Sequence, residues 1–174
     1  MIENILILDT ETTGLDPKKG AKVIEIAVVL YNLKFKSVLQ AFSTLYPCDN
    51  NPAEHINHIN PQSTKENYSL SCVDQFMMWI SDCSQAVVAH NAKFDKLFVE
   101  TLSFGRHILS KPWICTKQNF TWPIHLTRLR LEDICNAMGV QYLDAHRALS
   151  DCYFLVNCFN NVDDLEERIN KCLE

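Results

Sequence analysis

Residues 22–33 form an almost continuous apolar run, and this run constrains the fold more than any other part of the sequence. It is rich in valine and isoleucine, and Glu25 and Asn32 are the main polar interruptions within it. Apolar residues that do not alternate with polar ones are typical of a strand that is covered on both faces. The sequence therefore predicts a buried strand with other layers packed on each side.

Two more strands are predicted beside this one. Residues 4–9 are mainly aliphatic, residues 37–46 are the next candidate, and Gly14 lies in a turn between the first two strands. Three consecutive strands joined by short loops predict an antiparallel meander. Short apolar segments at residues 86–89 and 113–116 predict two further strands.

The second half of the chain changes to a helical pattern. Apolar residues recur there at helical spacing, which predicts helices at residues 72–82, 93–103, 129–138, 145–159 and 162–173. The polar stretch 47–70 carries no clear pattern. Three strands followed by alternating helices and strands predict an α/β fold, a mixed sheet with helices on both sides.

Composition limits the class of protein. With 174 residues, of which 47% are apolar, we expect one domain over residues 1–174. No signal peptide and no bilayer-spanning run is visible, so we expect a soluble, cytoplasmic protein without membrane contact. The eight cysteines are scattered without close pairs, which favours reduced, small apolar residues over a zinc site or disulfides. The net charge of −5 predicts only weak non-specific binding of nucleic acid.

The first chemically informative string contains Asp9 and Glu11. The two acids are two positions apart on the first predicted strand, so their side chains point to the same face. Carboxylate oxygens are the ligands that Mg²⁺ and Mn²⁺ prefer. The pair alone is weak support for a metal site, because acids at a strand end are also common as solvated surface groups.

Two later strings add Asp95, His146 and Asp151. Asp95 opens a predicted helix, where an ordinary acid in the first turn is the alternative interpretation. His146 and Asp151 are five positions apart, about 140° on a regular helix, so they meet only if His146 precedes the helix or lies in its first turn. Surface positions for both are the alternative. Four carboxylates brought together repel each other unless cations neutralise them, so the strings together predict a two-metal site with a histidine for proton transfer.

The three strings, at residues 9–15, 90–95 and 146–151, resemble the motifs of the DEDDh, or DnaQ-like, family of 3′–5′ exonucleases, and all five catalytic positions are filled. The resemblance covers roughly residues 5–160. Within the family the chain is most similar to exonuclease X, at residues 112–116 and 146–153. The resemblance implies the RNase H-like fold, a mixed five-stranded sheet flanked by helices.

The resemblance also implies a two-metal mechanism with Mg²⁺ or Mn²⁺. Asp9 would bridge two ions, Glu11 and Asp151 would complete the first site, and Asp95 would hold the second ion, largely through water. His146 would act as the general base that takes a proton from the attacking water. The product would be a nucleoside 5′-monophosphate cut from the 3′ end.

Substrate contacts are implied in the same way. Leu15 would stack on the terminal base, although packing back on the core is the alternative, and the backbone of Thr12 would meet the terminal 3′-OH. Further substrate-binding residues would be Asn91, Phe94, His58 and Ile59. Lys18, Lys19 and Lys22 are either phosphate contacts or solvated surface lysines.

One position departs from the family pattern. Relatives often carry a His-x-Ile string that contacts the terminal nucleotide, and Asn57 stands here where that histidine would be. Three other polar residues near the motifs favour structural roles. We expect Glu25 to be a hydrogen-bonded structural acid, His90 to be structural, and Asp144 to cap the helix that carries Asp151.

Three functions follow from these observations. The first is a 3′–5′ exonuclease that acts on single-stranded DNA or on 3′ ends of duplex DNA, for repair or degradation. The second is an RNA-trimming enzyme of the ribonuclease T or oligoribonuclease type, because sugar preference depends on groups near the 2′ position. The third is a proofreading or scaffold module bound to a polymerase. No appended partner-binding region is evident, which weakens this hypothesis, and the complete acid set argues against a catalytically silent relic.

Overall fold

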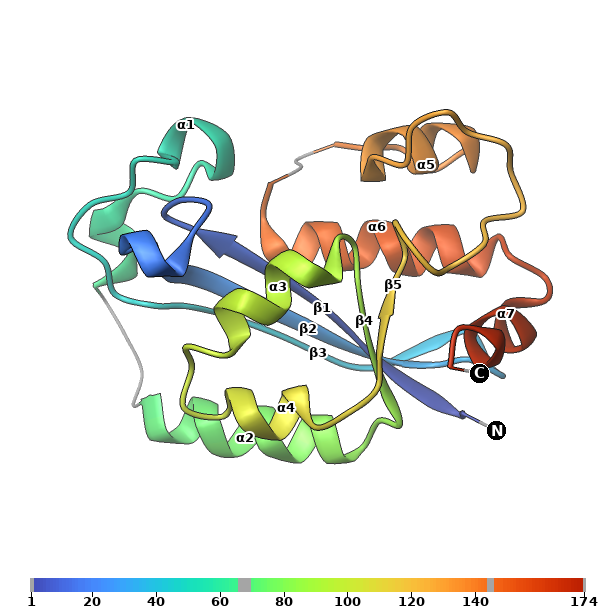
Figure 1. Cartoon of the computed structure of the whole chain (residues 1–174), viewed down its shortest axis with the longest axis horizontal. Coiled ribbons are helices and arrows are strands. Elements are labelled where there is room, and N and C mark those ends of the chain that lie inside the picture. Colours follow the sequence, from blue (N-terminus) through green and yellow to red (C-terminus); the bar gives the residue numbers. More distant parts are fainter. Residues whose placement is uncertain (1, 66–69, 144–145, 174) are drawn as a thin grey trace.

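The computed structural model describes residues 2–65, 70–143 and 146–173, and its centre is a five-stranded sheet in the order β3-β2-β1-β4-β5. β1 pairs antiparallel with β2, and β2 pairs antiparallel with β3, whereas β4 runs parallel to both β1 and β5 (Figure 1). The strands are β1 (Asn4–Thr12), β2 (Val23–Asn32), β3 (Ser37–Leu45), β4 (Ala86–Ala89) and β5 (Trp113–Cys115). The predicted meander and mixed sheet are therefore confirmed.

Helices cover both faces of the sheet (Figure 1). One apolar cluster joins the sheet to α5, α6 and α7, and a second joins its other face to α2, α3 and α4. The helices are α1 (Glu54–Asn57), α2 (Leu70–Asp82), α3 (Ala92–Val99), α4 (Gly105–Leu109), α5 (Leu131–Ala137), α6 (Ala148–Asn160) and α7 (Leu165–Lys171), with 3₁₀ turns at Pro17–Lys19 and Pro61–Thr64. None of the helices in the described ranges has the length and apolar character needed to cross a bilayer.

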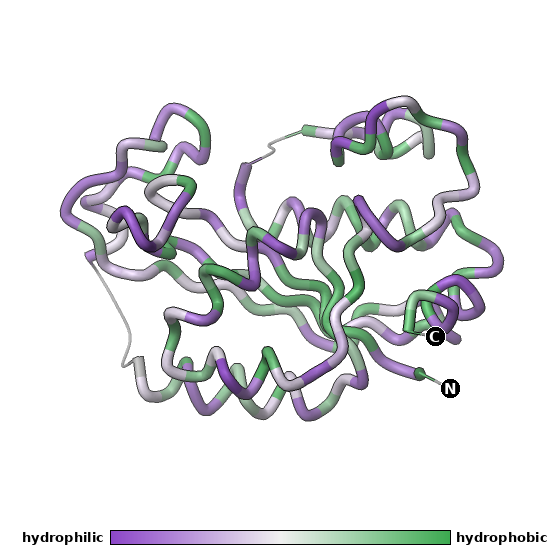
Figure 2. Tube along the Cα trace, viewed as in Figure 1, coloured by the Kyte–Doolittle hydropathy of each residue, from purple (hydrophilic) through white to green (hydrophobic). Residues whose placement is uncertain are grey.

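The central strands are the most hydrophobic part of the trace, and the connecting segments around them are more hydrophilic (Figure 2). Nine of the ten residues of β2 are buried, as its unbroken apolar run predicts. Along β1, Ile5 and Ile7 belong to the cluster under α6, whereas Leu6 and Leu8 belong to the cluster on the opposite face. This alternation decides which side chains near the end of β1 point toward α6.

Several predicted elements have different bounds in the structure. The helix predicted at residues 93–103 ends at Val99, and α4 follows as a separate short helix. A side chain at Gly105 would overlap the carbonyl group of Val99, so the chain folds back on itself at a glycine. The helix predicted to start at residue 145 begins at Ala148 instead, and α1 lies in the polar stretch that carried no clear pattern.

β1 is longer than predicted. It continues past Asp9 to Thr12, with a register shift against β2 between Glu11 and Thr12. Bulges of this kind redirect side chains and are common next to functional sites. Glu11 is thus held inside a paired strand.

Candidate active site

Three carboxylates converge between β1 and α6. Asp9 and Glu11 lie two apart on β1, and Asp151 lies in the first turn of α6, which packs against that face of the sheet. One oxygen atom of each acid lies within 4.8 Å of the others. The two-residue spacing on β1 therefore places Asp9 and Glu11 on the same face, as predicted, and α6 supplies the third carboxylate.

These acids hold their protons more strongly than usual. Burial, followed by the charges of neighbouring acids, raises the pKa of Asp9 well above its ordinary value and raises the pKa of Glu11 to about 8. Burial also raises the pKa of Asp151 to about 6, and His146 opposes that shift. Asp151 Oδ1 is buried without a hydrogen-bond partner among the described residues. Crowded acids and an unpartnered oxygen suit a cation, which would neutralise the acids and use that oxygen.

Asp95 reaches this region from the opposite helical layer. It lies in the first turn of α3, only 2% exposed, and accepts a 2.9 Å hydrogen bond from Thr10 Oγ1. Burial raises its pKa to about 7, against the effect of that hydrogen bond. Its charge raises the pKa of Asp9, so the two carboxylates are near neighbours. Asp95 does not belong to the group of three acids whose oxygen atoms lie within 4.8 Å of one another.

His146 precedes α6 rather than lying on it. It is exposed, with a left-handed backbone φ of 66°, and a hydrogen bond from its backbone lowers the pKa of Asp151. The rotation of about 140° that separates His146 from Asp151 on a regular helix therefore does not apply. Both residues line one open pocket together with Asp9.

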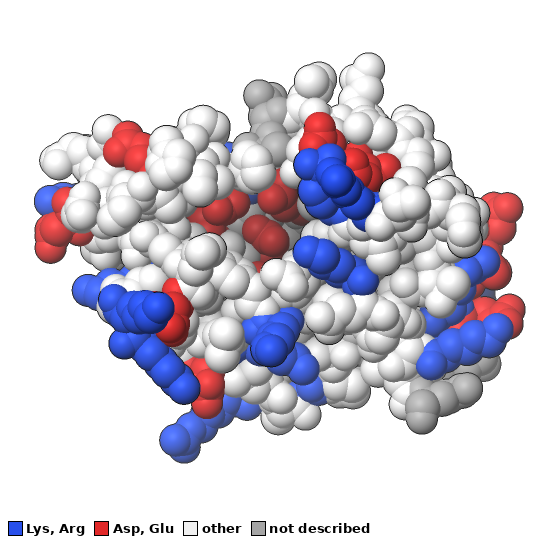
Figure 3. All heavy atoms as spheres, turned by 45° about the horizontal axis from the view of Figure 1, so that its top comes forward, with Lys and Arg blue, Asp and Glu red and all other residues white. Residues whose placement is uncertain are grey.

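The pocket is an acidic hollow with basic side chains beside it (Figure 3). Sequence reasoning missed Lys117 and Arg130, which line it and come from loops without a motif. Arg130 is engaged by Asp133 through two 2.8 Å contacts. Among the described residues, the pocket is lined by Asp9, His90, Asn91, Lys117, Arg130, Leu131, Glu132, Tyr142, His146 and Asp151.

His90 lies at the end of β4, with Nδ1 2.9 Å from Thr116 Oγ1. Burial is the main cause that lowers its pKa to about 4, so the ring is neutral near pH 7. This internal hydrogen bond agrees with the predicted structural role. Asn91 follows it with a left-handed φ of 68° and places α3 directly after the strand.

The residues expected to contact substrate differ in how much surface they offer. Leu15 is 85% exposed and His58 is exposed, whereas Ile59 is 2% exposed and packs with Ile24 and Cys48. Phe94 is half-buried and packs against Phe98 with tilted rings, whose centroids are 4.9 Å apart. Leu15 and His58 are thus the two with most surface free for a nucleotide.

Asn57 has turned inward at the position where relatives carry histidine. It is 1% exposed, and its Nδ2 donates to the carbonyl of Thr12 at 3.2 Å. Its Oδ1 accepts from Asn51 Nδ2 at 2.8 Å and from the backbone N–H of Ile59 at 3.2 Å. The amide therefore ties the α1 segment to the end of β1, one residue beyond Glu11.

Glu25 is a structural acid, as predicted. It is 1% exposed, and its carboxylate accepts hydrogen bonds from Arg147 and from the backbone N–H of Ala148. That N–H belongs to the first residue of α6. Asp144, predicted to cap this helix, lies outside the described residues.

Comparisons with known proteins agree with this geometry. The model of an exonuclease family, RNase T, matches residues 6–159. The DNA polymerase III subunit epsilon of Rickettsia conorii is 33% identical over 97 residues, which cover 54% of this chain and 41% of that protein. The 3′-5′ exonuclease DinG of Bacillus subtilis is 32% identical over 101 residues, which cover 56% of this chain and 10% of that protein. The chain thus spans less than half the length of these relatives.

Solved structures match over nearly the whole chain. Exonuclease X in complex with 5′ overhanging duplex DNA gives a TM-score of 0.66 at 22% identity, covering 97% of this chain and 99% of that one. Exonuclease I of E. coli in complex with a dT13 oligonucleotide gives 0.69 at 18% identity, covering 98% and 43%. At these identities the structural matches establish the fold, and the family match covers most of the sequence. The chain therefore belongs to the RNase T, or DnaQ-like, family of 3′–5′ exonucleases.

Proposed function

We propose that this protein is a metal-dependent 3′–5′ exonuclease that hydrolyses DNA from the 3′ end and releases nucleoside 5′-monophosphates. The observation that carries the proposal is the convergence of Asp9, Glu11 and Asp151, two of which, Asp9 and Asp151, line one pocket with His146. Asp95 lies beside them, close enough to raise the pKa of Asp9. Family membership supports the same reaction.

The residues present fit two Mg²⁺ or Mn²⁺ ions. Asp9, Glu11 and Asp151 would hold one ion, and Asp9 and Asp95 would hold the other. The fit rests on the raised pKa values of the acids and on the buried, unpartnered Oδ1 of Asp151. When bound, two such ions stabilise the charge that develops on the attacking and leaving oxygens of a phosphodiester.

The protein's own groups provide proton transfer and substrate position. His146 is exposed at the pocket, where its imidazole takes the proton of the attacking water. The apolar side chain of Leu15 stacks on the terminal base, and the backbone of Thr12 meets the terminal 3′-OH. Asn91, Phe94 and His58 complete the surroundings of the terminal nucleotide, with His58 providing the exposed side chain that Asn57 cannot, whereas the buried Ile59 offers almost no surface for contact.

DNA is the proposed substrate, and RNA trimming is the alternative. The two solved relatives described above were bound to DNA, which supports the first choice. A polymerase-bound scaffold remains the third candidate, since the relatives that match in sequence include a polymerase subunit.

The test uses purified protein and 3′-labelled single-stranded DNA, duplex DNA and RNA of one sequence, with Mg²⁺, Mn²⁺ or chelator. We expect mononucleotide release from DNA with metal and none with chelator or with Asp9→Asn. Release from RNA alone would select the alternative. Absence of release from every substrate with either metal would contradict hydrolysis and leave the scaffold role.

A further inference from the structure

The proposed site contains a buried acid that is not one of its metal ligands. Glu25 on β2 stands directly opposite Glu11 on β1, so both side chains project from the same face of the sheet. Two carboxylates directly opposite each other destabilise a sheet, and Glu25 also raises the pKa of Asp9, Glu11 and Asp151. A buried acid at this place needs a compensating partner.

Arg147 is that partner. Its Nε donates to Glu25 Oε2 at 3.0 Å and its Nη2 donates to Glu25 Oε1 at 2.9 Å. Glu25 Oε2 also accepts from the backbone N–H of Ala148 at 3.1 Å. Arginine suits this role because its planar guanidinium matches both oxygens of a carboxylate, which the point charge of lysine cannot do.

The ion pair acts at the point where α6 begins. Arg147 is the N-cap residue of α6, and its carbonyl accepts the backbone N–H of Asp151 at 3.0 Å. The residue just before it is His146, in its left-handed conformation. One arginine therefore connects β2 to the backbone of both His146 and Asp151.

We propose that the Glu25–Arg147 pair is a positioning unit, which fixes His146 and the first turn of α6 against the carboxylates of β1. The proposal rests on the proposed function for its effect on rate. Arg147 also lowers the pKa of Glu11, so the pair offsets the negative charge that Glu25 adds to the site.

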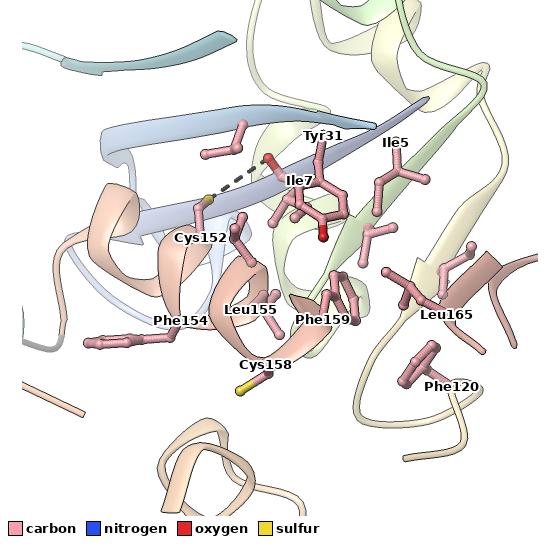
Figure 4. Close-up of a cluster of buried hydrophobic side chains, with 14 of the residues drawn as sticks. Ile5, Ile7, Tyr31, Phe120, Cys152, Phe154, Leu155, Cys158, Phe159 and Leu165 are labelled. Atoms are coloured by element: carbon pink, nitrogen blue, oxygen red, sulfur yellow. Dashed lines mark hydrogen bonds between the residues drawn. The ribbon is translucent and has the colours of Figure 1, made fainter. Parts of the chain in front are cut away.

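The body of α6 is held separately. Cys152, Leu155 and Phe159 lie in the apolar cluster with Ile5 and Ile7 of β1, and Cys152 Sγ donates to the carbonyl of Ile7 at 3.8 Å (Figure 4). These contacts remain when the pair is removed. Loss of the pair should therefore loosen the start of α6 while the fold persists.

The experiment compares Arg147→Ala, Arg147→Lys and the double variant Glu25→Leu/Arg147→Met, with Arg106→Ala on α4 as an exposed arginine control. Removing the Arg147 side chain leaves the carboxylate of Glu25 buried without a compensating charge, which destabilises the fold. An apolar pair at the two positions contains no buried charge, so it should restore stability. We measure Tm, Mn²⁺ affinity by calorimetry, and kcat and KM at saturating Mn²⁺.

Arg147→Ala should lower kcat and Mn²⁺ affinity by about 10- to 100-fold, with KM for DNA nearly unchanged, as for other groups that orient metal ligands. Arg147→Lys should recover part of the loss. The double variant should regain Tm while kcat stays low. Two results would overturn the positioning role. One is a double variant whose kcat recovers to the wild-type value together with its Tm, and the other is an Arg147→Ala variant that keeps both wild-type kcat and wild-type Mn²⁺ affinity.

If the wild-type protein hydrolyses no substrate, the proposed function fails, and the Mn²⁺ titration alone then decides the role of the pair. Weaker Mn²⁺ binding by Arg147→Ala than by Arg106→Ala would support positioning of the carboxylates. Equal binding by the two variants would overturn it.

Discussion

The hydroxyl of Thr10 donates a 2.9 Å hydrogen bond to Asp95, a residue 85 positions further along the chain. Thr10 lies between Asp9 and Glu11 on β1, and its side chain points away from α6. The bond therefore joins β1 to α3, the helix that carries Asp95. It lowers the pKa of Asp95, against the effect of burial.

Removing that hydroxyl should therefore weaken the site. In Thr10→Val the pKa of Asp95 rises further, and more of this acid is protonated at pH 7. We expect kcat and Mn²⁺ affinity to fall by about 10-fold, the lower end of the range for groups that support metal ligands. Thr10→Ser keeps the hydroxyl and should remain near wild type, and equal activity of the two variants would show that the bond has no role.

His146 should be dispensable for folding and essential for rate. Its side chain is exposed, so His146→Ala removes few packing contacts, whereas loss of a general base costs about 10²- to 10⁴-fold in rate. Because φ is 66° here, His146→Gly tests the backbone separately, since glycine adopts this conformation without strain. Single-turnover rates and Tm should show two stable, slow variants. Full rate in either one would rule out the histidine as base.

Leu15 should contribute to substrate binding and not to stability. It is 85% exposed, so Leu15→Ala should change the free energy of unfolding by less than about 0.5 kcal/mol. Loss of a stacking contact worth about 1–3 kcal/mol should raise KM by about 5-fold or more. Leu39→Ala on β3, also an exposed leucine, is the matched control. A large drop in Tm with unchanged KM would instead place Leu15 among packing residues.

Without metal, the protein should lose stability as pH rises from 6.5 to 9. The folded-state pKa of Glu11 is raised from 4.5 to about 8 and that of Asp95 from 3.8 to about 7, so the folded protein binds protons that the unfolded chain has released. The stability that these bound protons contribute is fully present below the unfolded-state pKa values, and it is lost as pH rises through the folded-state pKa values. His90 changes the stability only at more acidic pH, because its folded-state pKa is lowered to about 4.

The measurement is Tm in chelator across this pH range. Mn²⁺ should raise Tm most at the alkaline end, because the ion competes with fewer protons there. Glu11→Gln should flatten the slope in chelator. A Tm that rises with pH in chelator would contradict the pKa shifts assigned to these acids.

The sheet could be predicted from sequence because its causes are local. The apolar run of β2, the aliphatic start of β1 and the two-residue spacing of Asp9 and Glu11 each depend on neighbouring residues. The extension of β1 to Thr12 could not, since Glu11, Thr12 and the following residues are polar and resemble a turn. That segment is a strand because β2 pairs with it as far as Val23.

The parts of the site that were missed depend on long-range contacts. Glu25 and Arg147 are 122 positions apart, and the sequence shows only an acid inside an apolar strand and an arginine inside a motif. The inward turn of Asn57 likewise depends on the Thr12 carbonyl, 45 positions away. Such pairs become visible only when the fold places both partners together.

The most direct test of the central claim is an anomalous difference map from crystals grown with Mn²⁺ and a DNA oligonucleotide. We predict two peaks enclosed by carboxylate oxygens of Asp9, Glu11, Asp95 and Asp151, with His146 facing the phosphate that is cut. Carboxylates that point apart with no peak between them would contradict the proposed metal site and the reaction built on it.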